Sequence, residues 1–189
     1  MKIIIYLVFL ASLSAIAQDN VKRIGFSQCI VDEWRSSMDN EMRLEAQLQS
    51  TIKLDIRNAF GSIDRQIDDI NQFVKEQVDL IILSPLKSKP VTPAIDNAID
   101  AGIPVLVVDR MSISDKFTAY IGGDNYEVGK IAAQYIATDT NKKLATIIEI
   151  KGDNALSPAK DRNKGFRDEI KKFKNITIIG EVQGDWGRY

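Results

Sequence analysis

The sequence predicts an α/β protein built on a parallel, doubly wound sheet. Short apolar runs rich in β-branched residues recur along the chain, and amphipathic helical patterns lie between them with short connections. This alternation of strand and helix is typical of βαβ units, whose crossovers are right-handed. Several of the runs are apolar on both faces, which indicates strands buried between two layers of helices.

The strands follow one another at regular intervals. We expect them at 23–27, 52–58, 80–84, 105–109, 144–150 and 176–182. A shorter strand is expected to run into the glycine pair of the segment 119–125. Because each run is bounded by turn residues or by a helical pattern, the runs read as separate strands.

Four helices are expected between the strands, at 62–76, 91–101, 125–137 and 159–172. In the first helix, isoleucines and a valine recur at steps of four and three residues and form one apolar stripe. Ser62 is a plausible N-cap for this helix. The second helix should end at Gly102, with Pro104 preventing its continuation.

The organisation of the chain predicts two lobes, the second of them incomplete. We expect a leader at 1–17, an N-terminal α/β lobe at 18–122 and a partial C-terminal α/β lobe at 123–189. Five strands precede the glycine pair and only two long ones follow it, which is a lopsided count for two lobes. We therefore expect a truncated protein, either a fragment or the product of an interrupted gene.

Residues 1–17 have the pattern of a signal peptide for export. Lys2 is followed by an apolar stretch and then by Ala15 and Ala17, which form a small-x-small cleavage site. A buried strand or an uncleaved anchor is the alternative. Export would place the mature chain in the periplasm.

The composition excludes many kinds of chemistry. The chain has no His and a single Cys, so it contains no Ser-His-Asp or Cys-His pair, no His-ligated metal and no internal disulfide. With 25 Lys and Arg against 26 Asp and Glu, the net charge is −1. This balance gives no reason to expect nucleic acid as a partner. We expect no catalytic residues, no metal and no cofactor.

Charged and aromatic side chains gather at the ends of the predicted strands, where ligands bind in open α/β sheets. An aromatic face packs on a sugar ring, while Asp accepts and Arg donates the hydrogen bonds that fix hydroxyls. Each could instead cap a helix, solvate a loop or fill a local cluster. That alternative is weakest for the Asp-Arg pair, which follows an apolar strand directly. The candidate ligand-binding residues are Ser27, Trp34, Arg35, Asp109, Arg110, Arg162, Asp185 and Trp186.

These residues lie in segments that resemble type I periplasmic sugar-binding proteins, the ribose- and galactofuranose-binding class related to LacI-type ligand domains. The resemblance rests on IGFSQ and DEWR, on AIDAGIPVLVVDR, on YIGGDNYEVGK and on DRNKGFRDEI and QGDW, and it covers about residues 21–189. It implies that Asp109 and Arg110 bind sugar hydroxyls and that Arg162 contributes from the second lobe. It also implies an aromatic cover at Trp186, a second aromatic and basic pair at Trp34 and Arg35, and a hinge near 122–125.

The function that this resemblance implies is periplasmic binding of a monosaccharide as the solute-binding component of an ABC sugar importer. The partners would be a small-molecule sugar and either a membrane permease or a sensor kinase. The alternative is the sugar-sensing domain at the N-terminus of a hybrid two-component histidine kinase. An enzyme is disfavoured because the chain has no His, phosphate loop or dinucleotide fingerprint. A LacI-type repressor is disfavoured because an export signal stands where a DNA-binding headpiece would be.

Overall fold

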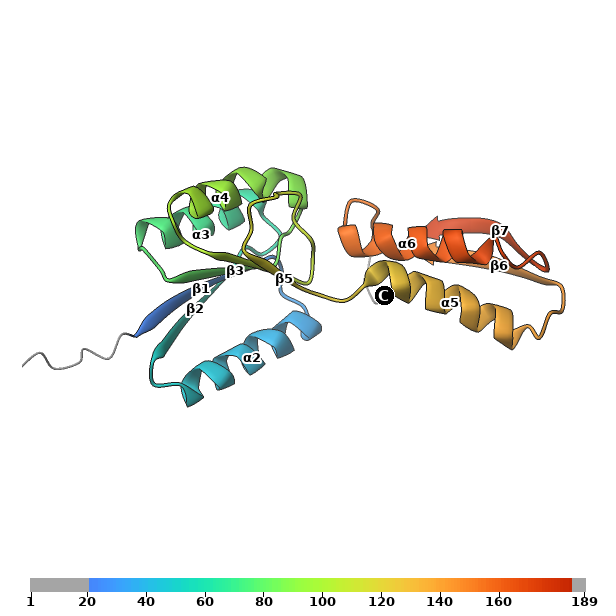
Figure 1. The fold of residues 1–189 in the computed structure, drawn as a ribbon, viewed down its shortest axis with the longest axis horizontal. Coiled ribbons are helices and arrows are strands. Elements are labelled where there is room, and N and C mark those ends of the chain that lie inside the picture. Colours follow the sequence, from blue (N-terminus) through green and yellow to red (C-terminus); the bar gives the residue numbers. More distant parts are fainter. Residues whose placement is uncertain (1–20, 185–189) are drawn as a thin grey trace, which may run out of the picture.

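A computed structural model describes residues 21–184 and places the first part of the chain in one parallel sheet (Figure 1). Its strands are β1 (Lys22–Gln28), β2 (Ile52–Asn58), β3 (Leu80–Leu83), β4 (Val105–Val108) and β5 (Ala119–Ile121). They lie in the order β2-β1-β3-β4-β5, and every neighbouring pair is parallel. The predicted parallel α/β fold is confirmed, and each of these strands matches its predicted range to within about one residue.

Helices cover both faces of this sheet, as double winding requires. Helix α2 (Glu33–Leu48) lies on one face, and α3 (Ile63–Lys75) and α4 (Ser88–Asp100) lie together on the other (Figure 1). Strands β3 and β4 are apolar throughout, and they form a buried core with α3 and α4 around Ile81, Phe73 and Ile95. We call β1 to β5 with their three helices the first lobe.

Helix α2 is not among the helices that the sequence predicts. Of its sixteen residues only Arg35 is buried, so it lacks the apolar stripe that identifies α3. Its start is encoded locally, because the Asp32 side chain accepts a hydrogen bond from the Arg35 N–H and caps the helix. The result places Trp34 and Arg35 in the first turn of a helix.

Two predicted helix ends are confirmed, and the start of α4 shows the largest difference from its predicted position. The Ser62 side chain accepts from the Arg65 N–H as an N-cap, and Gly102 follows α4 with a φ of 83° that suits glycine. Helix α4 begins at Ser88, before the predicted residue 91, and contains Pro93. That proline lies in the second turn, so it removes only one backbone hydrogen bond near the start of the helix.

The second part of the chain forms α5 (Asn125–Asp139), β6 (Ala145–Lys151), α6 (Ser157–Ile170) and β7 (Ile176–Gln183). Strands β6 and β7 are parallel, and they make a two-stranded sheet. Helices α5 and α6 pack against each other and, with Ile147 and Ile176, enclose a small core. We call these four elements the second lobe.

Residues 122–124 connect β5 to α5 and so join the two lobes (Figure 1). The carboxyl end of the first sheet faces this connection, which brings the turns after β1 and β4 close to α6. Among the described residues no helix is long and apolar enough to cross a membrane. The predicted leader and the candidate residues Asp185 and Trp186 lie outside the described range.

Candidate functional site

A cavity of about 890 Å³ lies where the carboxyl ends of the strands of both lobes meet. The first lobe contributes the turns after β1, β3 and β4, and the second lobe contributes the start of α6 and the ends of β6 and β7. Five of the eight predicted site residues line this cavity: Trp34, Arg35, Asp109, Arg110 and Arg162. We call this cavity the cleft.

The turn that carries Asp109 has an unusual backbone. Asp109 has a φ of 62°, and the Arg110 N–H donates to the Val108 carbonyl oxygen at 2.7 Å. A three-residue turn of this kind, a γ-turn with positive φ at its centre, is rare and strained. The turn directs two successive side chains, a carboxylate and a guanidinium, toward the same cleft.

Arg35 lies almost fully buried beside Asp109 and has an acceptor on each of its three nitrogens. Its Nη2 donates to Asp109 Oδ2 at 2.6 Å, its Nη1 to Asp32 Oδ2 at 2.7 Å and its Nε to Cys29 Sγ at 3.1 Å. Burial opposes the charge, but the contacts with Cys29, Asp32 and Asp109 outweigh it and raise the pKa of Arg35. The guanidinium is therefore a fixed cation that holds one oxygen of Asp109.

The negative charge of Asp32 is stabilised by Arg35. Partial burial works against ionisation, but the Arg35 backbone N–H and guanidinium outweigh it, and the pKa of Asp32 falls below its usual range. Asp32 thus caps α2 and anchors Arg35 with two different oxygens.

Arg110 is buried on the other side of the turn. Its Nη1 donates to the carbonyl oxygens of Leu86 at 3.0 Å and Pro85 at 3.5 Å, both in the loop after β3. No described residue accepts from its Nη2. Arg110 is thus held through Nη1, with its Nε 3.9 Å from Asp109 Oδ2, and has Nη2 with which to donate to a ligand.

The aromatic and second-lobe walls of the cleft come from Trp34 and Arg162. The Trp34 side chain is 57% exposed, and the Arg35 guanidinium lies over its ring at 5.2 Å from the centroid. Arg162, in the second turn of α6, donates from Nε to the Pro158 carbonyl oxygen at 3.1 Å. The wall therefore offers an open aromatic face from one lobe and a cation from the other.

Ser27 is the one described candidate that the structure keeps out of the cleft. Its side chain is fully buried and donates from Oγ to Asp69 Oδ2 of α3 at 3.2 Å. Because side chains alternate along a strand, Ser27 faces α3 together with Gly25, while Gln28 faces α2 and donates to Asp39. Partial burial is the main cause of a raised pKa at Asp69.

Several lining residues were not predicted as ligand contacts from the sequence. They come from the α2 cap, from the loop after β3 and from the second lobe: Asp32, Glu33, Leu86, Lys87, Asp153 and Gln183. Leu86, Lys87, Asp153 and Gln183 lie one to three residues after predicted strands, so their position at strand ends was a usable signal. Asp32 and Glu33 lie five and six residues after the first predicted strand, at the start of helix α2, which the sequence did not predict.

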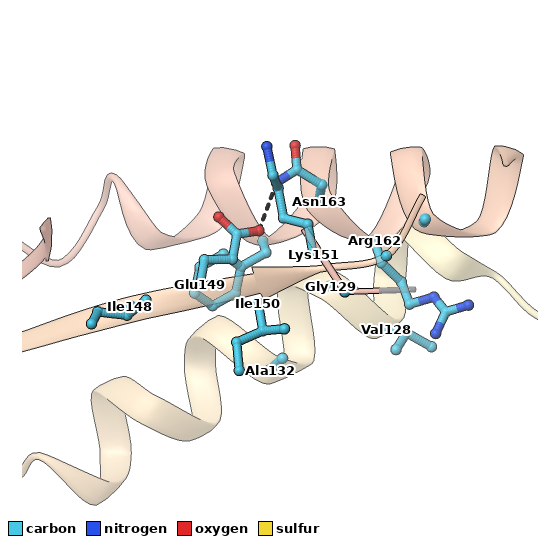
Figure 2. A pocket seen from close by; sticks show the side chains of 13 residues that line it. Val128, Gly129, Ala132, Ile148, Glu149, Ile150, Lys151, Arg162 and Asn163 are labelled. Carbon is cyan, nitrogen blue, oxygen red and sulfur yellow. Dashed lines mark hydrogen bonds between the residues drawn. The ribbon is translucent and has the colours of Figure 1, made fainter. Parts of the chain in front are cut away.

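A second cavity, of about 620 Å³, lies in the second lobe beside β6 (Figure 2). It is mainly apolar, with Val128 and Ala132 of α5 near Ile150 of β6. Asn163 donates to Glu149 at 2.6 Å along one side, as Figure 2 shows. Within residues 21–184, β6 pairs only with β7, so this groove follows an unpaired strand edge. No group of three or more His, Cys, Asp or Glu in the same range could hold a metal ion.

Comparison with known proteins identifies the family. The model of the periplasmic binding protein domain matches residues 25–188. The chain belongs to the periplasmic binding protein family. The described cleft lies at the carboxyl ends of the strands, the edge at which open α/β sheets bind ligands.

Named sugar-binding members of the family are similar to the chain over most of its length. The galactofuranose-binding protein YtfQ of Escherichia coli (strain K12) is 32% identical over 182 residues, which are 94% of this chain and 57% of YtfQ. The ribose import binding protein RbsB of Bacillus subtilis (strain 168) is 28% identical over 137 residues, 72% of this chain and 44% of RbsB. The chain thus spans about half the length of these curated relatives.

Solved structures of the family share the fold. The fructose-binding periplasmic domain of a hybrid two-component system has a TM-score of 0.80 and 39% identity, and the match covers 87% of this chain and 55% of that one. A galactofuranose-binding protein has a TM-score of 0.79 and 31% identity, with coverage of 87% and 56%. The predicted type I periplasmic-binding-protein fold is confirmed, and the partial coverage agrees with an incomplete second lobe.

Proposed function

We propose that the cleft binds a monosaccharide and that the chain provides the sugar-binding part of an ABC importer. The observation that carries the proposal is the Asp109–Arg110 turn, which presents a carboxylate and a guanidinium side by side at the cleft. Asp109 Oδ2 is held by Arg35, which leaves Oδ1 to accept from a sugar hydroxyl. Arg110 Nη2 is placed to donate to a neighbouring oxygen.

The composition of the cleft favours a neutral polyol over an ion. Its charged lining residues are four acids and four bases: Asp32, Glu33, Asp109 and Asp153 with Arg35, Lys87, Arg110 and Arg162. Neither charge dominates, so a ligand with many hydroxyls can both donate and accept. Trp34 supplies an exposed ring against which the C–H face of a sugar can pack.

The names of the relatives agree with this ligand class. They are described as binding galactofuranose, ribose or fructose, each a monosaccharide. We propose the same class for this chain, periplasmic location after export, and binding without catalysis. The absence of His from the sequence supports the last point, since it removes the commonest general base.

A sensor domain is the second candidate function. It is supported by the 39% identity with the fructose-binding domain of a hybrid two-component system. Both functions use the same sugar-dependent movement of two lobes. A fusion of the chain's gene to a histidine kinase would favour the sensor, and neighbouring genes for a permease and an ATPase would favour the importer.

Titration calorimetry with D-fructose, D-ribose and D-galactose tests the proposed function. We expect at least one sugar to bind, and Trp34→Ala to weaken its binding by about 0.5–1.5 kcal/mol beyond the loss of contact area. The melting temperature should change little, because Trp34 is 57% exposed. Tyr135→Ala, which removes an exposed aromatic ring from α5 outside the cleft, is the matched control.

Two results would contradict the proposal. One is the absence of heat with every sugar of the panel, and the other is equal weakening by Trp34→Ala and Tyr135→Ala. The first would show that the cleft binds none of these sugars, and the second would show that the ring of Trp34 has no special relation to a bound sugar.

A further inference from the structure

The strained turn at Asp109 is held in place by the strand that leads out of the first lobe. The Asp109 N–H donates to the Ile121 carbonyl oxygen at 3.0 Å, and the Tyr120 hydroxyl donates to the Asp109 carbonyl oxygen at 2.9 Å. Both polar atoms of the Asp109 backbone are therefore bonded to β5. A residue at φ 62° that lies in a γ-turn needs such support, because the conformation is otherwise unfavourable.

Tyr120 reaches Asp109 only because Gly122, two residues further along the chain, has no side chain. A Cβ atom added to Gly122 would overlap the Tyr120 hydroxyl oxygen and lie 2.9 Å from its Cε1 atom. A Cβ atom added to the next residue, Gly123, would meet nothing within 4 Å. The tyrosine ring thus folds back over Gly122, at the start of the segment that joins the two lobes.

We propose that Tyr120 is a positioning residue of the cleft, which holds the Asp109 turn in its strained form and links that turn to the crossover at Gly122. This inference rests on the proposed function, since it assigns Tyr120 a role in presenting Asp109 to a sugar. Tyr120 itself does not line the cleft. It acts through the backbone of Asp109.

The surroundings of the hydroxyl agree with this role. Burial, together with the negative charges of Asp109 and Asp161, raises the pKa of Tyr120. The hydroxyl therefore keeps its proton and remains a donor throughout the neutral range. Asp161 belongs to α6, so a charge of the second lobe contributes to the raised pKa of this hydroxyl.

Amide hydrogen exchange in the complete chain tests the link without requiring a ligand. The test variants are Tyr120→Phe, which removes only the hydroxyl, and Gly122→Ala, which displaces the ring. Their matched controls are Tyr126→Phe, which removes a tyrosine hydroxyl bonded to Asp168, and Gly123→Ala, which adds a methyl group in open space. The N–H groups of Asp109 and Arg110 are followed by NMR.

We expect both test variants to speed exchange of the Asp109 and Arg110 N–H groups by about 2- to 10-fold, the range that one net hydrogen bond allows. The controls should leave these two rates unchanged. Wild-type rates in Tyr120→Phe would overturn the proposal. If Gly122→Ala does not fold, Tyr120→Phe decides alone, because it keeps the ring.

The affinities for D-fructose, D-ribose and D-galactose, measured by calorimetry, separate this proposal from the proposed function. We expect Tyr120→Phe to weaken sugar binding by about 2- to 10-fold, as for the exchange rates, and Tyr126→Phe to leave the affinity unchanged. If no sugar of the panel binds the wild-type chain, the proposed function fails, while the exchange rates still report on the Tyr120 contact. Faster exchange with unchanged affinity would show that Tyr120 stabilises the turn but does not position Asp109 for the ligand.

Discussion

At the scale of the residue, Arg35 and Asp109 of the cleft are fixed by protein partners before any ligand arrives. Arg35 is held by Cys29, Asp32 and Asp109, and the Asp109 backbone is held by β5. Side chains fixed in this way lose little conformational entropy on binding, which favours affinity. The strain at Asp109 is offset by the same hydrogen bonds that position it.

The charge of Asp32 should make part of the stability depend on pH. Its pKa is lowered in the folded chain, so the ionised form stabilises the fold above the ordinary Asp pKa of about 3.9, and this stability is lost as pH falls through the lower folded value. We expect Asp32→Asn to lower the free energy of unfolding by about 0.5–1 kcal/mol at pH 7, as for a partly exposed ion pair. Asn retains the N-cap acceptor.

Urea unfolding at pH 7 and at pH 3 checks this prediction. The difference between wild type and Asp32→Asn should shrink at the lower pH, whereas Asp115→Asn, at an exposed loop position, should change neither value. A constant difference at both pH values would show that the loss comes from capping or packing and not from the charge.

At the scale of the element, the second lobe depends on two glycines where α5 crosses α6. A Cβ atom added to Gly129 would overlap the Arg162 carbonyl oxygen, and one added to Gly165 would overlap the Tyr126 carbonyl oxygen. The two helix backbones therefore approach closely, each through a residue that has no side chain. This contact joins the helix that follows the crossover to the helix that carries Arg162.

Replacing Gly165 should destabilise the second lobe in spite of the better helix propensity of alanine. Gly165→Ala gains about 1 kcal/mol of propensity, but the overlap with a backbone atom cannot be relieved by a side-chain rotation. We expect a net loss of about 1–3 kcal/mol in the free energy of unfolding, measured by urea titration. Helical signal that melts in an earlier, separate transition would assign the loss to α5 and α6.

Gly180→Ala is the matched control for this substitution. Gly180 lies in β7, and a Cβ atom there would meet nothing within 4 Å. Its unfolding should stay close to that of the wild type. Equal losses in the two variants would mean that the close approach of α5 and α6 is not the cause.

At the scale of the whole molecule, the two lobes are unequally covered. One face of the two-stranded sheet exposes Ile148, Ile150, Ile179 and Val182, and α5 exposes Val128, Ile131 and Tyr135. Within the described range, the edge of β6 beside the groove of Figure 2 pairs with no strand. Exposed apolar area next to a free strand edge promotes association between chains.

We expect the chain to self-associate, with a weight-average mass in sedimentation that rises with concentration. Ile148→Thr together with Ile150→Thr should reduce this rise, since threonine keeps the β propensity and removes apolar area. Leu48→Gln removes an equally exposed apolar residue from α2, in the other lobe, and should leave association unchanged. A monomer at every concentration would contradict the prediction.

The alternation of strands and helices and the polar residues at the strand ends could be predicted from local patterns in the sequence. Local periodicity and caps such as Ser62 predict the strands and helices. The preference of ligands for the carboxyl ends of strands predicts the site residues. Helix α2 was not predicted because Arg35 is its one buried residue, so it has no apolar stripe. The incomplete second lobe was predicted from the count of strands and agrees with the coverage of the family's structures.

Which of these residues lie together depends on contacts between distant parts of the chain. Arg35 and Asp109 are 74 positions apart, and no local pattern relates them. Their contact exists because β1 and β4 run parallel with only β3 between them, so the turns that follow β1 and β4 lie at the same edge of the sheet. Ser27 points toward α3 and away from the cleft. The alternation of side chains along β1 predicts which residues share a face, but not which face is covered by α2 and which by α3. That assignment comes from the tertiary structure.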